Sequence, residues 1–262
     1  MFRRFLLGAA LAVTAAVTLP LAAPVAHSQE AAAEVPLLKG DWSFDGIFGT
    51  IDKASAQRGL QIYKEVCSNC HGLYEMSYRN IAALGYDPDQ VKAFAAQFQV
   101  NDIGDDGAVV QRPAKPSDKF VLPFPNEKAA RAANNGAYPP DLALIEKSRE
   151  GGADYVYSIM QGYKDAPADV TLSDGQYYNI YFSRGGQKIG MPQPLTDGAV
   201  TFDGGAPNDL KSEAHDVATF LAWAAEPEQD ARKRLGVRVM LFLIVLTGAL
   251  YYSKRKIWAN IH

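Results

Sequence analysis

Cysteine is scarce in this sequence. Its 262 residues contain only two cysteines, Cys67 and Cys70, which are separated by two residues. A zinc site built from two cysteine pairs is excluded, because no second pair exists to complete it. A framework of several disulfides is excluded for the same reason. The function of these two thiols must therefore be explained by the residues that immediately surround them.

Acidic residues are absent from both ends of the chain. All 29 aspartates and glutamates lie within residues 29–231, where 17 lysines and arginines leave a net charge of −12. An acidic domain repels the phosphates of nucleic acids, so we expect no nucleic-acid partner. The same charge could steer basic protein partners or simply confer solubility, and charge alone does not choose between these two interpretations.

The first 28 residues have the order of a secretory signal peptide. Arg3 and Arg4 are followed by an apolar run and then by small residues, with Pro20 and Pro24 interrupting any helix. This order of charged, hydrophobic and cleavage regions predicts a signal peptide over residues 1–28. An uncleaved membrane anchor is the alternative interpretation of the same segment.

The other end of the chain predicts a membrane span. Residues 235–252 are apolar except for Arg238, and a helix of this length, about 27 Å, nearly fills a hydrocarbon core of about 30 Å. Basic clusters at 232–234 and 254–256 disfavour the alternative of a buried core helix. We predict an anchor over residues 231–253 and a cytoplasmic tail over 254–262. The export signal would place the domain at residues 29–230 on the periplasmic side of the inner cell membrane.

The motif that indicates a chemical function is Cys67-Ser68-Asn69-Cys70-His71. In C-x-x-C-H the two thiols form thioether bonds to a haem, and the adjacent histidine becomes the proximal iron ligand. We therefore predict one covalent haem c attached through Cys67 and Cys70, with His71 on the iron. A redox-active thiol pair is the alternative, but no thioredoxin-like strand pattern surrounds the motif.

The second iron ligand decides what the haem can do. Met191 lies in the proline-stiffened loop Ile189–Pro192, and we predict that it binds the distal face. His215 and an open position are the alternatives, whereas Met76 lies too close to the motif and Met160 suits a helical core. An iron with two protein ligands shuttles electrons, whereas an open iron suits a haem-based sensor or a peroxidase.

Helical periodicity surrounds this motif. Residues 54–66 have an apolar side, and Gly59 leaves room for a second helix, predicted over 214–225, to cross closely. A helix with this glycine that leads into C-x-x-C-H resembles the class I cytochrome c fold. Weaker patterns predict helices over 88–99 and 155–163, short strands near 109–111 and 199–202, and Asp141 as a helix cap.

Several longer motifs together resemble one family, cytochrome c1, the haem subunit of the cytochrome bc1 complex, in its bacterial type. They occur in order at residues 131–137, 139–142, 151–156, 189–192 and 220–228, which read RAANNGA, PPDL, GGADYV, IGMP and FLAWAAEPE. The resemblance implies a mainly α, class I cytochrome c-like fold with long loop insertions. It also implies one C-terminal transmembrane helix.

The resemblance also implies roles for individual residues. Cys67 and Cys70 would attach the haem, His71 and Met191 would bind iron, Asn134 and Pro139 would line the pocket, and Arg149 and Tyr155 would hold a propionate. Guanidinium pairs bidentately with a carboxylate, which suits the role of the arginine. Some bacterial relatives have an extra disulfide that restrains the methionine loop. This chain has no spare cysteines, so packing must hold that loop.

The resemblance implies an electron carrier rather than a catalyst by itself. Within a quinol–cytochrome c reductase, the chain would pass electrons from a Rieske iron–sulfur protein to a c-type cytochrome, beside cytochrome b in the lipid bilayer of a dimeric multisubunit complex. Acidic candidates for the acceptor surface are Asp102, Asp105, Asp106 and residues 165–174. The alternative is an anchored monohaem subunit of another respiratory oxidase or reductase.

Overall fold

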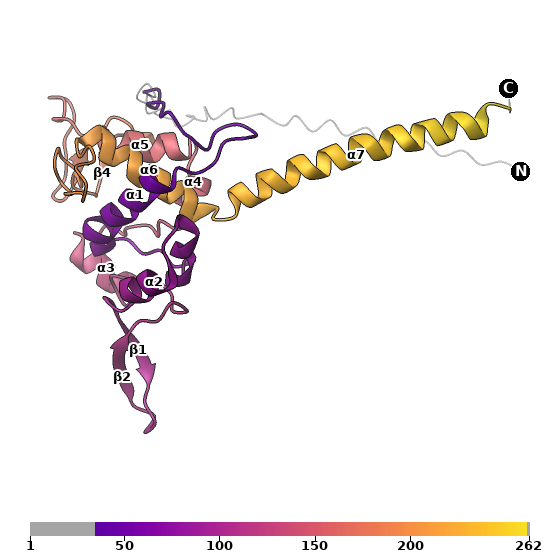
Figure 1. Ribbon diagram of the computed structural model, residues 1–262. Helices are drawn as coiled ribbons and strands as arrows, with labels where there is room; N and C mark the ends of the chain where they lie inside the picture. The colour runs from indigo at the N-terminus through magenta and orange to yellow at the C-terminus, as the bar shows by residue number, and fades with distance from the viewer. Residues whose placement is uncertain (1–34, 261–262) are drawn as a thin grey trace, which may run out of the picture. The chain divides into compact units, whose positions relative to one another are not determined.

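The computed structural model describes residues 35–260, so the predicted signal peptide lies outside the described residues. Figure 1 shows a mainly helical chain, as predicted. The α-helices are α1 (Lys53–Glu65), α2 (Pro88–Ala95), α3 (Glu127–Ala133), α4 (Ile145–Ser148), α5 (Ala153–Gln161), α6 (Leu210–Ala225) and α7 (Gln229–Trp258). The strands are β1 (Gln99–Ile103), β2 (Val109–Pro113), β3 (Tyr177–Tyr178) and β4 (Lys188–Ile189), and 3-10 turns lie at Cys67–Asn69, Tyr78–Leu84 and Ser183–Gly185.

Helices α1 and α6 cross closely at Gly59. A side-chain carbon at this position would lie 2.1 Å from the carbonyl oxygen of Asp216 and 2.5 Å from Cβ of Phe220, both in α6. Only glycine permits this approach, because the two backbones leave no space for a Cβ atom. The predicted helices over 54–66 and 214–225 and their close crossing are therefore confirmed, although α6 begins four residues earlier, at Leu210.

A buried ion pair joins the same two helices. Asp216 of α6 is 4% exposed and accepts hydrogen bonds from Nε and Nη2 of Arg58, at 2.5 and 2.7 Å. The hydroxyl of Ser55 donates a third hydrogen bond, at 2.6 Å, to the same carboxylate. Removing Arg58 would leave the buried carboxylate of Asp216 without its cation, which is destabilising, whereas Arg58 itself is 30% exposed. The pair therefore fixes how α1 lies on α6.

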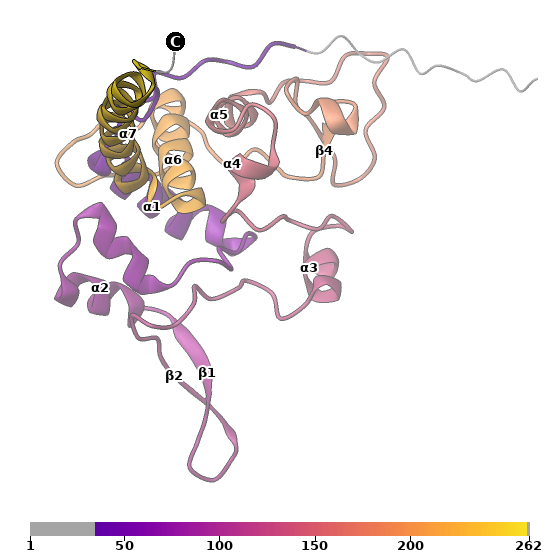
Figure 2. The ribbon, with the colours of Figure 1, turned by 90° about the vertical axis from the view of Figure 1, so that its right-hand side faces the viewer.

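The region after α2 differs from the prediction. Helix α2 begins at Pro88 as predicted, but it ends at Ala95 instead of residue 99, because the chain then enters β1. Strand β1 pairs antiparallel with β2, with Val100 opposite Arg112. The predicted strand near 109–111 is thus confirmed, and its partner was not predicted. The hairpin lies apart from α1 and α6 in both views (Figures 1 and 2).

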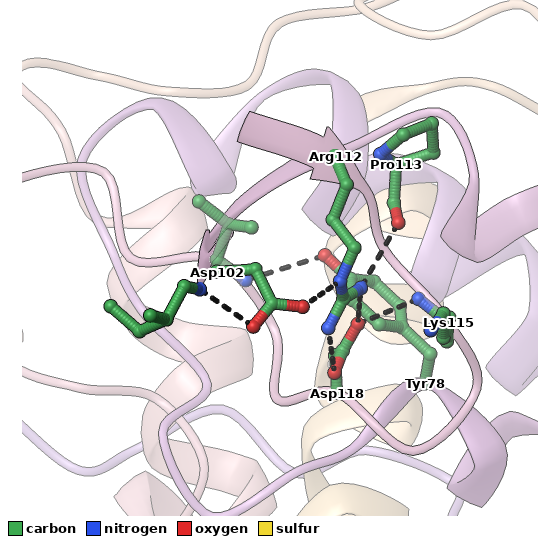
Figure 3. Close-up of polar contacts among 8 residues, drawn as sticks. Tyr78, Asp102, Arg112, Pro113, Lys115 and Asp118 are labelled. Carbon is green, nitrogen blue, oxygen red and sulfur yellow. Dashed lines mark hydrogen bonds and ion pairs between the residues drawn. The ribbon is translucent and has the colours of Figure 1, made fainter. Parts of the chain in front are cut away.

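Arg112 attaches this hairpin to the loop that follows it (Figure 3). Its guanidinium donates to Asp118 at 2.6 Å and forms an ion pair with Asp102 on the opposite strand. Asp118 also accepts from the backbone N–H of Lys115, and its carbonyl accepts from the N–H of Tyr78. These contacts stabilise a two-stranded ribbon, a structure that is only marginally stable by itself in water.

The prediction of a strand near residues 199–202 is wrong. The backbone N–H of Val200 donates to the side chain of Glu213 in α6 at 2.8 Å, and Val200 and Phe202 are buried in the core. The segment therefore packs as an irregular loop on α6, because its backbone bonds with a helix side chain rather than with another strand. The helix predicted over 155–163 is confirmed as α5, which begins and ends two residues earlier than predicted.

Helix α7 is long and apolar enough to cross a membrane, as predicted. It has 30 residues, and none of its most apolar 18-residue window is buried against the rest of the chain. The helix extends two residues before and five residues beyond the predicted anchor at 231–253. The side chains of α7 are therefore available to a surrounding apolar phase.

The crossing at Gly59 generates a prediction. Gly59→Ala should lower the free energy of unfolding by about 1–3 kcal/mol, because the added methyl group must push the two helices apart. Chemical denaturation of the detergent-solubilised protein measures the loss. Gly236→Ala in α7 is the matched control, because a Cβ there meets nothing within 4 Å. Equal stability of the two variants would contradict the close crossing.

Candidate functional site

Helix α1 ends where the C-x-x-C-H motif begins. The motif forms a tight turn in which the N–H groups of Cys70 and His71 both donate to the carbonyl of Cys67, at 3.1 and 2.9 Å. The hydroxyl of Ser68 donates to the carbonyl of Lys64, at 2.7 Å. This turn gathers the two thiols and the imidazole at one end of the helix, as the spacing predicts, and neither cysteine forms a disulfide.

The surroundings of Cys67 do not suit a reactive thiol. Burial raises the pKa of this thiol to about 12, and the neighbouring Cys70 acts in the same direction. A redox-active C-x-x-C pair requires the opposite shift, because the thiolate is the reacting form. The environment therefore disfavours a redox-active thiol pair at Cys67 and Cys70.

The imidazole of His71 is held in a defined tautomer. Its side chain is 9% exposed, and Nδ1 lies 2.7 Å from the carbonyl oxygen of Pro140. A carbonyl only accepts, so Nδ1 carries the hydrogen and Nε2 retains its lone pair. Burial lowers the pKa of His71, which keeps the ring neutral. A neutral imidazole whose other nitrogen is hydrogen-bonded is the arrangement of a metal ligand.

Asp141 holds the segment that contains this carbonyl. Its carboxylate accepts from the N–H groups of Tyr74, at 2.8 Å, and Ala143, at 2.9 Å. The predicted role as a helix cap is wrong: α4 begins at Ile145 after Leu144, and Asp141 instead bonds with the chain that leaves the motif. Asp141 thus ties the Pro140 carbonyl to the segment that follows His71, a role that no sequence signal indicated.

A cavity of about 450 Å³ lies beside the motif. Its lining includes Cys70, Gly72, Leu122, Phe124, Tyr138 and Pro139. Pro139 is therefore at the wall of this cavity. Asn134 is not among the residues that line this cavity; its side-chain amide donates to the carbonyl of Ala130, at 2.7 Å, and Ala130 lines the cavity.

The loop that contains Met191 is held by packing and hydrogen bonds. The hydroxyl of Tyr163 donates to the carbonyl of Met191, at 3.0 Å. Ile189 is buried and pairs with Tyr177 of β3. A Cβ at Gly190 would lie 2.9 Å from Cβ of Ala137, so the loop packs directly on the segment before Pro139. The hydrogen bond from Tyr163 had no sequence signal.

Arg149 and Tyr155 lie on either side of the Gly151–Gly152 turn, whose two residues have φ of 90° and 53°. Burial raises the pKa of Tyr155, while the guanidinium groups of Arg149 and Arg184 oppose that rise. Two cations near a partly buried tyrosine suit the recognition of a carboxylate. Arg184 belongs to none of the motifs that carried the resemblance, and only the fold brings it to this cluster.

The residues present fit a haem c. Two neighbouring thiols and an imidazole whose Nε2 retains its lone pair stand at the end of α1, next to a cavity lined by apolar and polar side chains. Arginines near Tyr155 match the carboxylates that haem carries. The fold and the donor set are therefore those of a helical c-type haem domain joined to one long apolar helix.

Comparison with known proteins defines the family. The sequence model described as the Cytochrome C1 family matches residues 42–261. Cytochrome c1 of Rhodospirillum rubrum is 44% identical over 244 residues, which cover 87% of this chain and 89% of that protein. A mitochondrial cytochrome c1 heme protein of Solanum tuberosum is 42% identical over 234 residues, with 88% and 89% coverage.

A protein of Bradyrhizobium diazoefficiens named cytochrome b/c1 is 47% identical over 244 residues. The match covers 84% of this chain but 35% of that longer protein. The chain belongs to the cytochrome C1 family, and the resemblance drawn from its motifs is confirmed.

The role of Asp141 generates a prediction. Asp141→Ala should lower the free energy of unfolding by about 0.5–1.5 kcal/mol, because two backbone N–H groups exchange a carboxylate acceptor for water. It should also broaden the spectroscopic signature of the His71 site, because the Pro140 carbonyl is no longer held. Denaturation and absorption spectra measure the two effects. Asp106→Ala is the control, because its carboxylate accepts only locally, from Ala108. Equal spectra for both variants would contradict this role.

Proposed function

We propose that the chain is the electron-transferring haem subunit of a quinol–cytochrome c oxidoreductase, the cytochrome bc1 complex. The main support for this proposal is the tautomer of His71, the histidine of the C-x-x-C-H motif at the end of α1. Its Nδ1 is hydrogen-bonded to the carbonyl oxygen of Pro140, which leaves the lone pair of Nε2 available. Membership of the cytochrome C1 family supports a haem-containing subunit of this complex. The chain is then an electron carrier and needs no acid–base residue of its own.

In this proposal Cys67 and Cys70 would hold one haem covalently, and His71 and Met191 would bind its iron. When bound, the haem supplies a centre that accepts and releases one electron. Pro140 keeps Nε2 of His71 available, and Tyr163 holds the backbone of Met191. Two protein ligands keep other molecules off the iron, which restricts the site to electron transfer.

The remaining predicted residues would surround the haem. Pro139 lies at the cavity wall, and Asn134 supports that wall through Ala130. Arg149 and Tyr155 would bind a propionate, with Arg184 adding a second positive charge beside the tyrosine. Pairing with guanidinium compensates the charge of a partly buried carboxylate, which would otherwise be costly to remove from water.

The partners follow from the family. Electrons would arrive from a Rieske iron–sulfur protein and leave to a c-type cytochrome, in a dimeric complex that contains cytochrome b. The name of the Bradyrhizobium relative, cytochrome b/c1, supports cytochrome b as a neighbour. The acidic domain supports a basic acceptor. Asp105 and Asp106 at the hairpin tip are better candidates for that contact than Asp102, whose charge is paired with Arg112.

The membrane arrangement completes the proposal. Residues 1–28 are the signal peptide, 29–230 form the periplasmic cytochrome domain, 231–253 anchor it, and 254–262 are the cytoplasmic tail. The exposed apolar surface of α7 supports the anchor. The basic residues on both flanks would lie among lipid headgroups.

The distal ligand can be tested directly. Met191→Ala should lower the haem midpoint potential and change the ferric spectrum, because the iron loses its thioether and takes up water or remains open. Potentiometry and absorption spectroscopy measure both. Met160→Leu is the control, because Met160 packs against the hydrophobic core and should leave the spectrum unchanged. An unchanged potential and spectrum for Met191→Ala would exclude this ligand.

Membership of the complex has a separate test. Gentle solubilisation of the membranes that contain the tagged chain should yield a single species in which the haem c band accompanies a cytochrome b spectrum and a Rieske iron–sulfur signal. Optical and electron paramagnetic resonance spectra identify the two partners. A haem c protein that purifies with oxidase or reductase subunits instead would place the chain in another respiratory complex.

A further inference from the structure

The segment from Ser43 to Thr50, called here the Ser43–Thr50 loop, is closed by hydrogen bonds immediately before α1. The N–H of Thr50 donates to the carbonyl of Ser43, at 3.0 Å, and the N–H of Asp52 donates to the Ser43 hydroxyl, at 3.0 Å. Gly46 has a φ of 71° at the turn. The loop is therefore a fixed turn whose two ends are tied together.

Apolar side chains of this loop face in opposite directions. Phe44 is buried in the core, together with the flanking Trp42 and Ile51. At the tip, Ile47 is 70% exposed and Phe48 is 82% exposed. Two adjacent large apolar side chains that stand in solvent on a fixed turn mark a contact with an apolar partner, whereas scattered single ones do not.

The loop is also fastened to the start of α7. Nζ of Lys233 donates to the carbonyls of Phe44 and Gly49, and the carboxylate of Asp230 accepts from the N–H of Ile51, at 3.2 Å. Leu235, where the apolar stretch of α7 begins, lies two residues after Lys233, about 3 Å further along the helix axis. The loop is thus held within one helical turn of the point where α7 becomes apolar.

The charges near the loop suit a lipid surface. Asp45 is the only charged residue within it, and Lys233 of α7 contacts it between two further basic residues, Arg232 and Arg234. Headgroup phosphates attract such basic residues, while apolar side chains at the same depth enter the boundary of the hydrocarbon. The chemistry of the loop therefore continues that of α7 itself.

We propose that the Ser43–Thr50 loop is a second membrane contact, in which Ile47 and Phe48 insert into the lipid interface beside α7. The inference rests on the proposed function only in requiring that α7 spans the bilayer. A second contact, on a turn fastened to both the core and α7, fixes the face that the haem domain turns toward the membrane.

Site-directed spin labelling tests this contact. The full-length, haem-loaded protein with Phe48→Cys is labelled, purified with the subunits that accompany it, and reconstituted in phosphatidylcholine–phosphatidylglycerol vesicles. Collision with oxygen, which partitions into lipid, is compared with collision with a water-soluble nickel chelate. Ile103→Cys on β1 is the matched aqueous control, because Ile103 is 67% exposed and lies outside the loop. The unsubstituted protein shows whether Cys67 and Cys70 take up any label.

The expected result is an oxygen-to-nickel collision ratio several-fold higher at position 48 than at position 103. A ratio equal to that of the control would place the loop in water and overturn the inference. Low collision with both reagents would show that another protein subunit covers the loop, and it would overturn the inference equally. An unchanged haem spectrum shows that each labelled protein is folded.

A label on α7 separates this inference from the proposed anchor. Ile244→Cys, in the middle of the apolar stretch, should show the highest oxygen-to-nickel ratio of the three positions. If the label at 244 reports water, the proposed membrane span itself is wrong. If 244 reports lipid and 48 reports water or protein, only the loop contact is wrong.

Discussion

Where α1 crosses α6, the absence of a side chain at Gly59 lets the two backbones come into contact. The Arg58–Asp216 ion pair holds the two helices in this position. The other parts of the site are placed relative to this pair of helices. Helix α1 delivers the C-x-x-C-H turn at its end, and Phe220 of α6 packs against Tyr63, whose hydroxyl donates to the carbonyl of His71. A change at the crossing would therefore move the motif as well as the core.

The segment at residues 134–143 contacts both His71 and the loop that contains Met191. Pro140 orients the imidazole of His71, and Asp141 binds that segment to the chain after the motif. Ala137 packs against Gly190, the neighbour of Met191. A single loop thus contacts the surroundings of both proposed iron ligands. This explains how the methionine loop is held without a disulfide.

The haem domain and α7 are joined by more than the peptide chain. Glu226, at the end of α6, pairs with Lys147 of α4 and with Arg232 of α7, while Lys233 binds the Ser43–Thr50 loop. Ion pairs at a surface contribute little stability individually, but several on different elements restrict rotation about a short connection. The orientation of the domain relative to α7 is consequently fixed at the start of that helix.

Local patterns in the sequence were sufficient to predict α1, α6, α7 and the role of the C-x-x-C-H motif. Helical periodicity and a long apolar run show directly which side chains are removed from water. The tertiary structure alone decided features whose hydrogen-bond partners lie far away in the chain. Arg112 holds the unpredicted β1–β2 hairpin through Asp118, Glu213 takes the backbone bond that a strand at 199–202 would have needed, and Asp141 binds Tyr74 instead of capping a helix. A side-chain carboxylate accepts from whichever donor the fold brings near, and its own neighbours in sequence do not specify that donor.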